Sequence, residues 1–168
     1  GGPYLGFMAT LTKHMRKLPG RIVGQTTDSK GDTAYVLSLQ AREQHIRREK
    51  ASSNICSNQA LCAFTAGLYM ATMGPDGMAE AARQSMAKAH YLAAKLCEIP
   101  GVLLKYKGDF FHEFVTEMPR QDEVLKALED ADILGGVPVE DGIMWCATEK
   151  VTRAQLDRAI EVVKEVLA

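Results

Sequence analysis

The feature that most constrains this chain is a long helical pattern of apolar residues that is broken once, at Gly74-Pro75. Apolar residues recur at helical spacing from about Asn54 to Met73. After the break, Asp76 can cap a second helix from about Gly77 to Cys97. Because proline removes a helical hydrogen bond, the pattern predicts two consecutive helices, of which the second is a long connector. We expect small or flexible residues to form the buried stripe of this second helix: Met78, Ala82, Met86, Ala89, Ala93 and Leu96.

The segment after Pro100-Gly101 has the pattern of a small two-layer α/β unit. Strands are predicted at residues 102–106, 110–117 and 143–148, and helices at residues 121–131 and from Thr152 to the end. Thr152 is followed three residues later by Gln155, which is the signature of a capping box at the start of a helix. The expected layout is β-β-α-β-α.

The segment before Gly74 has strand patterns but does not close a core by itself. Residues 4–10 read as a buried strand, and two further strand-like runs flank the turn residues Asp28-Ser29-Lys30-Gly31 of a β-hairpin. A parallel sheet needs strands paired on both sides and helices over both faces. We therefore expect residues 1–76 to be the end of a larger domain whose sheet lies upstream, and residues 77–168 to hold the connecting helix and a small domain. The exposed edge of the first strand predicts self-association of this chain.

Composition excludes several classes of function. The formal net charge of -1 gives no global attraction to nucleic acid or anionic lipid. No apolar run reaches the roughly 18 residues of a membrane-spanning helix, so a cytoplasmic protein is expected. The four cysteines and four histidines show no zinc-site spacing, which predicts reduced core thiols and no metal ion.

The stretch from Arg42 to Ala63 is the least ordinary part of the chain. Basic side chains crowd its first nine residues, and small polar ones follow in Ser52-Ser53-Asn54. Without interleaved aromatic residues, nucleic-acid binding is disfavoured. Bidentate pairing of the arginines with carboxylates of a partner or of the missing upstream domain is favoured. The small polar residues can hold an anion or simply cap the helix, and both readings stay open. Cys56 has no dedicated base nearby, so we assign no catalytic residue.

This same stretch, with "GGPYLGFMAT" and "LPGRIVGQTTDSKG" upstream, resembles the P-protein of the glycine cleavage system, the decarboxylating glycine dehydrogenase. The resemblance is to subunit 1 of the two-subunit form, and it is continuous from Gly1 to about Gly74. It implies the carboxy-terminal part of a type I pyridoxal-phosphate-dependent transferase fold, similar to aspartate aminotransferase. In that fold the end of the large domain is followed by a small α/β domain. Ser52 and Ser57 stand where we expect threonine in many relatives, and both keep the hydroxyl.

The resemblance also implies a function. The family decarboxylates glycine with pyridoxal phosphate and transfers the aminomethyl group to the lipoyl arm of H-protein. The Schiff-base lysine lies in a His-Lys-Thr motif of subunit 2, and no such motif occurs in this chain. We therefore expect a silent, assembly-supporting component of a cytoplasmic heterotetramer. The candidates for the interface with subunit 2, or for the rim of its site, are Arg42, His45, Arg47, Arg48, Lys50, Ser52, Ser53 and Asn54.

Two alternatives remain from the sequence. The chain could come from another type I pyridoxal-phosphate enzyme, such as an aminotransferase or desulfurase. Residues 77–168 could also be a free-standing α/β interaction module.

Overall fold

A computed structural model describes residues 5–18, 22–38, 44–51, 59–140 and 142–168. The chain divides into two compact units, Gly2–Tyr69 and Met70–Ala168. One long helix, α2, continues from the first unit into the second. The predicted domain boundary between residues 76 and 77 stays a prediction.

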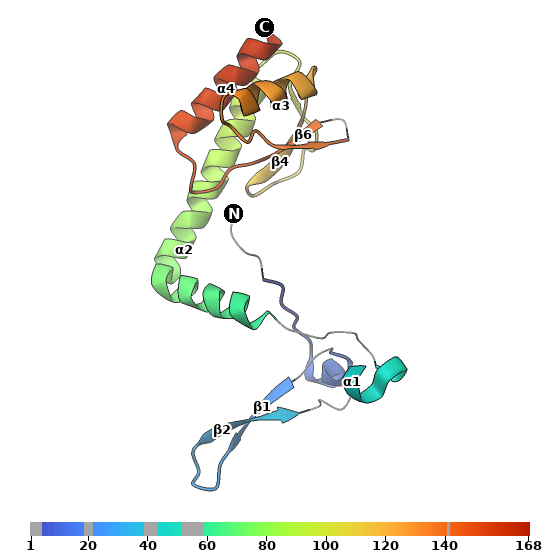
Figure 1. Cartoon of the computed structure of the whole chain (residues 1–168). Coiled ribbons are helices and arrows are strands. Elements are labelled where there is room, and N and C mark those ends of the chain that lie inside the picture. The colour runs from blue at the N-terminus through green and yellow to red at the C-terminus, as the bar shows by residue number, and fades with distance from the viewer. Residues whose placement is uncertain (1–4, 19–21, 39–43, 52–58, 141) are drawn as a thin grey trace. The chain divides into compact units, whose positions relative to one another are not determined.

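The first unit consists of short elements (Figure 1). A 3-10 helix, η1, covers Thr12–Lys17, and strands β1 (Ile22–Thr27) and β2 (Thr33–Ser38) form an antiparallel hairpin. The predicted turn is confirmed: the Asp28 carboxylate accepts hydrogen bonds from the backbone N–H groups of Lys30 and Asp32, at 2.8 and 3.0 Å. Helix α1 (Gln44–Arg47) and the 3-10 turn η3 (Arg48–Lys50) follow.

The buried strand predicted at residues 4–10 is wrong for the described residues 5–10, which have no strand pairing. Within the described part of this unit, every residue is half-buried or exposed. The side chain of Phe7 is 89% exposed and that of Met8 is 61% exposed. A strand needs a neighbouring ladder for its backbone groups, and β1 and β2 pair with each other instead. The exposed apolar residues extend through the unit: Leu11, Val23, Tyr35, Val36, Leu37, Ile46, Leu61, Phe64 and Leu68.

Helix α2 covers Ala60–Cys97 and is interrupted where the sequence predicts. Gly74 has φ 64° and ψ 178°, outside the helical region, and Pro75 follows it. The predicted stripe is partly wrong, because Met78, Ala82 and Met86 are exposed, whereas Ala89, Ala93 and Leu96 are buried as expected. The core of the second unit covers α2 only from Ser85 onward, so the amino-terminal half of the stripe lies outside it.

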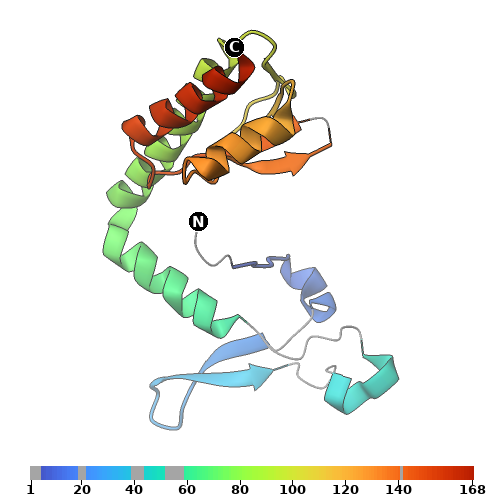
Figure 2. The ribbon, with the colours of Figure 1, turned by 45° about the horizontal axis from the view of Figure 1, so that its top comes forward.

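The second unit is a four-stranded antiparallel sheet with helices over one face. Strands β3 (Leu103–Leu104), β4 (Glu113–Glu117), β5 (Val137–Val139) and β6 (Gly142–Cys146) are arranged in the order β3-β4-β6-β5. Helices α3 (Gln121–Asp130) and α4 (Arg153–Leu167) complete it, and the carboxy-terminal half of α2 runs beside α4 in both views (Figures 1 and 2).

The buried face of the sheet is set by strand alternation. Phe114 and Thr116 on β4 pair with Trp145 and Ile143 on β6, and all four are at least 95% buried. The indole N–H of Trp145 donates to the Thr116 hydroxyl at 2.7 Å, which satisfies both buried polar groups. Residues from the three helices close this core: Leu92, Leu96, Val124, Leu128, Leu156, Ile160 and Val163.

The predicted β-β-α-β-α layout is confirmed except for one strand. The capping box at α4 is present, with the Gln155 N–H donating to the Thr152 hydroxyl and the Thr152 N–H donating to the Gln155 side chain. The sequence analysis missed β5 because this three-residue strand contains Pro138, which is typical of a turn. Proline is tolerated there because β5 pairs on one side only, at the edge of the sheet.

Among the described residues, no helix is both long enough and apolar enough to cross a membrane. Three of the cysteines lie in the described part of the chain, and each is unpaired. Their predicted core location is wrong, because Cys97 and Cys146 are exposed and Cys62 is half-buried.

Candidate functional site

The basic segment of the sequence forms the short elements α1 and η3. Arg47 ends the first and Arg48 begins the second. Arg48 has φ 52°, a left-handed conformation that costs a non-glycine residue about 1–2 kcal/mol. The N–H of Ala51 donates to the Arg48 carbonyl at 3.1 Å and closes the turn. Strained backbone of this kind is often found at functional sites.

The side chains of Arg47, Arg48 and Lys50 are exposed. Among the described residues, neither the Arg47 nor the Arg48 guanidinium has a hydrogen-bond or ion-pair partner. An exposed guanidinium offers five N–H donors in a planar fork, which fits a carboxylate or phosphate of another molecule. The segment therefore presents two adjacent arginines, with guanidinium groups unpaired among the described residues, to solvent.

The remaining predicted residues are only partly placed. Arg42, Ser52, Ser53 and Asn54 lie outside the described residues, as does Cys56. The backbone of His45 lies in α1, and the His45 side chain is outside the described part of the structure. The structure thus brings Arg47, Arg48 and Lys50 together on one short segment and leaves the other candidates as predictions.

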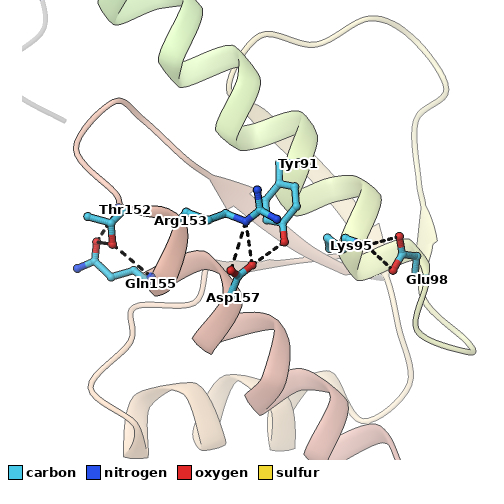
Figure 3. Close-up of polar contacts among 7 residues, drawn as sticks. All are labelled: Tyr91, Lys95, Glu98, Thr152, Arg153, Gln155 and Asp157. Carbon is cyan, nitrogen blue, oxygen red and sulfur yellow. Dashed lines mark hydrogen bonds and ion pairs between the residues drawn. The ribbon is translucent and has the colours of Figure 1, made fainter.

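A second polar cluster joins α2 to α4 (Figure 3). The Tyr91 hydroxyl donates to the Asp157 carboxylate at 2.5 Å, and the Arg153 Nε donates to both carboxylate oxygens, at 3.1 and 3.3 Å. The guanidinium carbon of Arg153 also lies 3.5 Å from the centre of the Tyr91 ring. The Asp157 carboxylate therefore orders two side chains, that of Tyr91 on α2 and that of Arg153 at the start of α4.

Hydrogen bonding explains the proton affinities in this cluster. The bond from Tyr91 to Asp157 raises the pKa of the tyrosine and lowers the pKa of the carboxyl group. On the same helix, the ion pair of Lys95 with Glu98, at 2.8 Å, raises the pKa of the lysine and lowers that of the glutamate. Each group is therefore held in its ordinary charge state at neutral pH, which suits a clamp between helices and not a proton-transfer site.

A third contact ties α2 to the loop before α4. The Glu149 N–H donates to the Ser85 hydroxyl at 3.0 Å, and the Lys88 ammonium donates to the Glu149 carbonyl at 2.7 Å. Together with the Tyr91 cluster, these bonds fix the connecting helix against the small domain. The sequence analysis did not assign these residues, and its one usable signal was the i,i+4 spacing of Arg153 and Asp157.

Five of the described lysines do not fit the role of a cofactor-binding Schiff base. Lys13, Lys17, Lys30 and Lys50 are exposed, whereas such a lysine needs a desolvated pocket that lowers its pKa. Lys126 bonds to Asp130 at 2.7 Å, and this contact raises its pKa instead. None of these five residues offers the geometry of a pyridoxal-phosphate site.

The unpaired thiols also lack the character of nucleophiles. Partial burial raises the pKa of Cys97, and burial together with the Glu113 carboxylate raises the pKa of Cys146. Reactive cysteines have the opposite shift, because the thiolate is the attacking form. The described site residues and the fold therefore define an α/β component that presents exposed arginines.

Comparisons with known proteins identify the family. The family model described as glycine cleavage system P-protein matches residues 1–163. The probable glycine dehydrogenase (decarboxylating) subunit 1 of Chlorobaculum parvum is 48% identical over 94% of this chain and 36% of its own length. That of Moorella thermoacetica is 47% identical over 100% of this chain and 40% of its own length. The chain belongs to the P-protein family of the glycine cleavage system.

A solved structure gives the same result for the fold. The crystal structure of glycine decarboxylase (P-protein) of the glycine cleavage system, in inhibitor-bound form, matches 99% of this chain with a TM-score of 0.89 and 42% sequence identity. The match covers 40% of that chain. The predicted fold, part of a P-protein, is confirmed, and the chain spans about two fifths of the length of these relatives.

Proposed function

We propose that this chain serves as the carboxy-terminal portion of P-protein subunit 1, a cytoplasmic component that assembles with subunit 2 for glycine decarboxylation. The observation that carries the proposal is the match over nearly the whole chain to relatives that bear the name subunit 1. In the complete enzyme, pyridoxal phosphate supplies the electron sink for loss of CO2, and the aminomethyl group passes to the lipoyl arm of H-protein. The Schiff-base lysine belongs to subunit 2 in this proposal.

The apolar surface of the first unit supports a role in assembly. Its described residues include Phe7, Tyr35 and Phe64, whose side chains are 89%, 69% and 67% exposed. Exposed apolar side chains of this kind need a covering surface. The expected upstream part of the larger domain, together with a partner subunit, would supply the core that the described residues do not form. Self-association of the chain alone stays a prediction, and it now rests on this apolar surface and not on a strand edge at residues 5–10.

The adjacent arginines support a specific part of that interface. Arg47 and Arg48 are exposed and uncompensated, and Arg48 is held in a left-handed conformation by its turn. Arginine is enriched among interface residues that dominate binding energy, at about 2 kcal/mol or more each. We place these two residues at the contact with subunit 2, in a heterotetramer of both subunits.

The test is the double variant Arg47→Ala/Arg48→Ala, introduced into complete subunit 1 and combined with subunit 2. The expected loss is at least about 2 kcal/mol, which corresponds to association weaker by roughly 30-fold or more, measured by sedimentation, with a parallel loss of CO2 release from glycine. The matched control is Arg83→Ala/Arg158→Ala. These two arginines are also exposed, but each is already paired with carboxylates of this chain. Normal association of the first variant would refute the interface assignment.

A further inference from the structure

Three side chains with metal-ligating atoms meet at one end of the sheet in the second unit. His112 lies in the bend that leads into β4, Glu113 is the first residue of β4, and Cys146 is the last residue of β6. Cys146 is more than thirty positions from the other two in the sequence, and the pairing of the two strands brings it beside them. None of them belongs to the proposed interface or to the contacts that clamp α2.

The sheet ladder fixes this arrangement. Glu113 and Cys146 are directly opposite partners in the antiparallel pair β4–β6. The next rung is a hydrogen bond from the Ala147 N–H to the His112 carbonyl, at 3.1 Å. One nitrogen of His112, one carboxylate oxygen of Glu113 and the sulfur of Cys146 all lie within 4.8 Å of one another. Directly paired residues of an antiparallel sheet have Cβ atoms about 4.5–5.5 Å apart, so their side chains can close on one ion.

The binding capacity of these groups is not used elsewhere in the described part of the chain. Cys146 is an unpaired thiol, and the His112 Nε2 is 4.0 Å from the nearest Glu113 oxygen, too long for a hydrogen bond. The His112 Nδ1 is buried and has no hydrogen-bond partner among the described residues. A buried polar atom without a partner costs stability, and an ion or water beside the ring is a common explanation.

We propose that His112, Glu113 and Cys146 bind one divalent transition-metal ion of the zinc class. Imidazole, thiolate and carboxylate are the three ligand types that zinc takes in proteins. As the Sγ–Zn bond forms, the thiol proton leaves to solvent. Three protein ligands leave the fourth coordination position of a tetrahedral ion for water.

Glu113 also lines a hollow of about 270 Å³ on the open face of the sheet, next to Val115 and Met144. The bound ion cross-links β4 to β6 at the end of the sheet.

The proposal is independent of glycine decarboxylation, and it is tested on the untagged 168-residue chain with metal alone. Co²⁺ is titrated first, because thiolate coordination gives a charge-transfer absorption band that reports Cys146 directly. Zn²⁺ is then used to displace Co²⁺ and to measure the stoichiometry by calorimetry. The expected result is one ion per chain, a thiolate band, and a rise in the thermal unfolding midpoint with Zn²⁺.

Cys146→Ser is expected to abolish the thiolate band. Glu113→Gln is expected to weaken Zn²⁺ binding by at least about 10–100-fold, which is the range measured when a residue that only supports a metal ligand is replaced. Glu113 is exposed, so its variant keeps the fold even if Cys146→Ser does not. The matched control is Cys97→Ser, which removes another exposed, unpaired thiol and leaves binding unchanged. A thiolate band that survives Cys146→Ser, a loss in Cys97→Ser, or unchanged affinity in Glu113→Gln overturns the proposal.

Discussion

Replacement of Thr116 by valine tests how the core of the second unit is held together. Valine has the shape of threonine, so no cavity is created, but the hydroxyl that accepts the hydrogen bond of Trp145 is lost. Both side chains are buried, Thr116 at 0% and Trp145 at 2% exposure, so water cannot replace the missing acceptor. A buried donor left without a partner costs about 1–3 kcal/mol. For a domain of about 100 residues, this corresponds to a lower midpoint by about 4–24 °C.

The same substitution in a Trp145→Phe background supplies the control. Phenylalanine removes the N–H group, so the valine no longer strands a donor, and Thr116→Val should then be nearly neutral or stabilising. The coupling between the two positions is therefore expected to be about 1–3 kcal/mol. Urea unfolding followed by circular dichroism measures all four proteins. Trp145 is the only tryptophan, so its fluorescence also reports this site in the two proteins that keep it. An equal cost of Thr116→Val in both backgrounds would refute the hydrogen-bond argument.

Two further predictions concern the same unit. Gly142→Ala would place a Cβ 2.5 Å from the Thr116 carbonyl oxygen, so we expect the free energy of unfolding in urea to fall by about 1–3 kcal/mol. The control is Gly108→Ala, which has open space around it and should change the free energy of unfolding by less than about 0.5 kcal/mol. The hydrogen bond from Tyr91 lowers the pKa of Asp157 in the folded state. The Asp157 carboxylate therefore stabilises the fold above its unfolded pKa of about 3.9, and this stabilisation is lost as pH falls through the folded pKa. Asp157→Asn should therefore flatten the acid limb of the stability–pH curve, and an unchanged acid limb would contradict this reading.

Local signals predicted much of the second unit. The capping box of Thr152 and Gln155, the break at Gly74 and the helix end at Cys97 each depend on neighbours in sequence, and the structure confirms all three. The strand at residues 5–10 was predicted from apolar composition alone. Strand formation also needs a partner ladder, which the described residues of this chain do not supply, so the prediction was wrong there.

The candidate site was predictable to a smaller extent. The basic segment stood out by its charge density, and the exposure of Arg47 and Arg48 agrees with a binding role. The clamp between Tyr91 and Asp157 and the cluster at His112 could not be predicted, because their partners are distant in sequence and meet only through packing and strand register. Sequence spacing identifies sites within one element, and the tertiary fold creates the others.

The central claim is that this chain performs the role of the carboxy-terminal part of subunit 1. The most direct test takes the subunit 1 relative that matches all of this chain, replaces its matching two fifths by these 168 residues, and adds subunit 2 and H-protein. The measured quantity is CO2 release from labelled glycine, with complex formation followed in parallel. We predict that the exchanged subunit forms the complex and supports glycine-dependent CO2 release, and that neither subunit does so alone. A folded, exchanged subunit that fails to associate with subunit 2 or to support CO2 release would contradict the account.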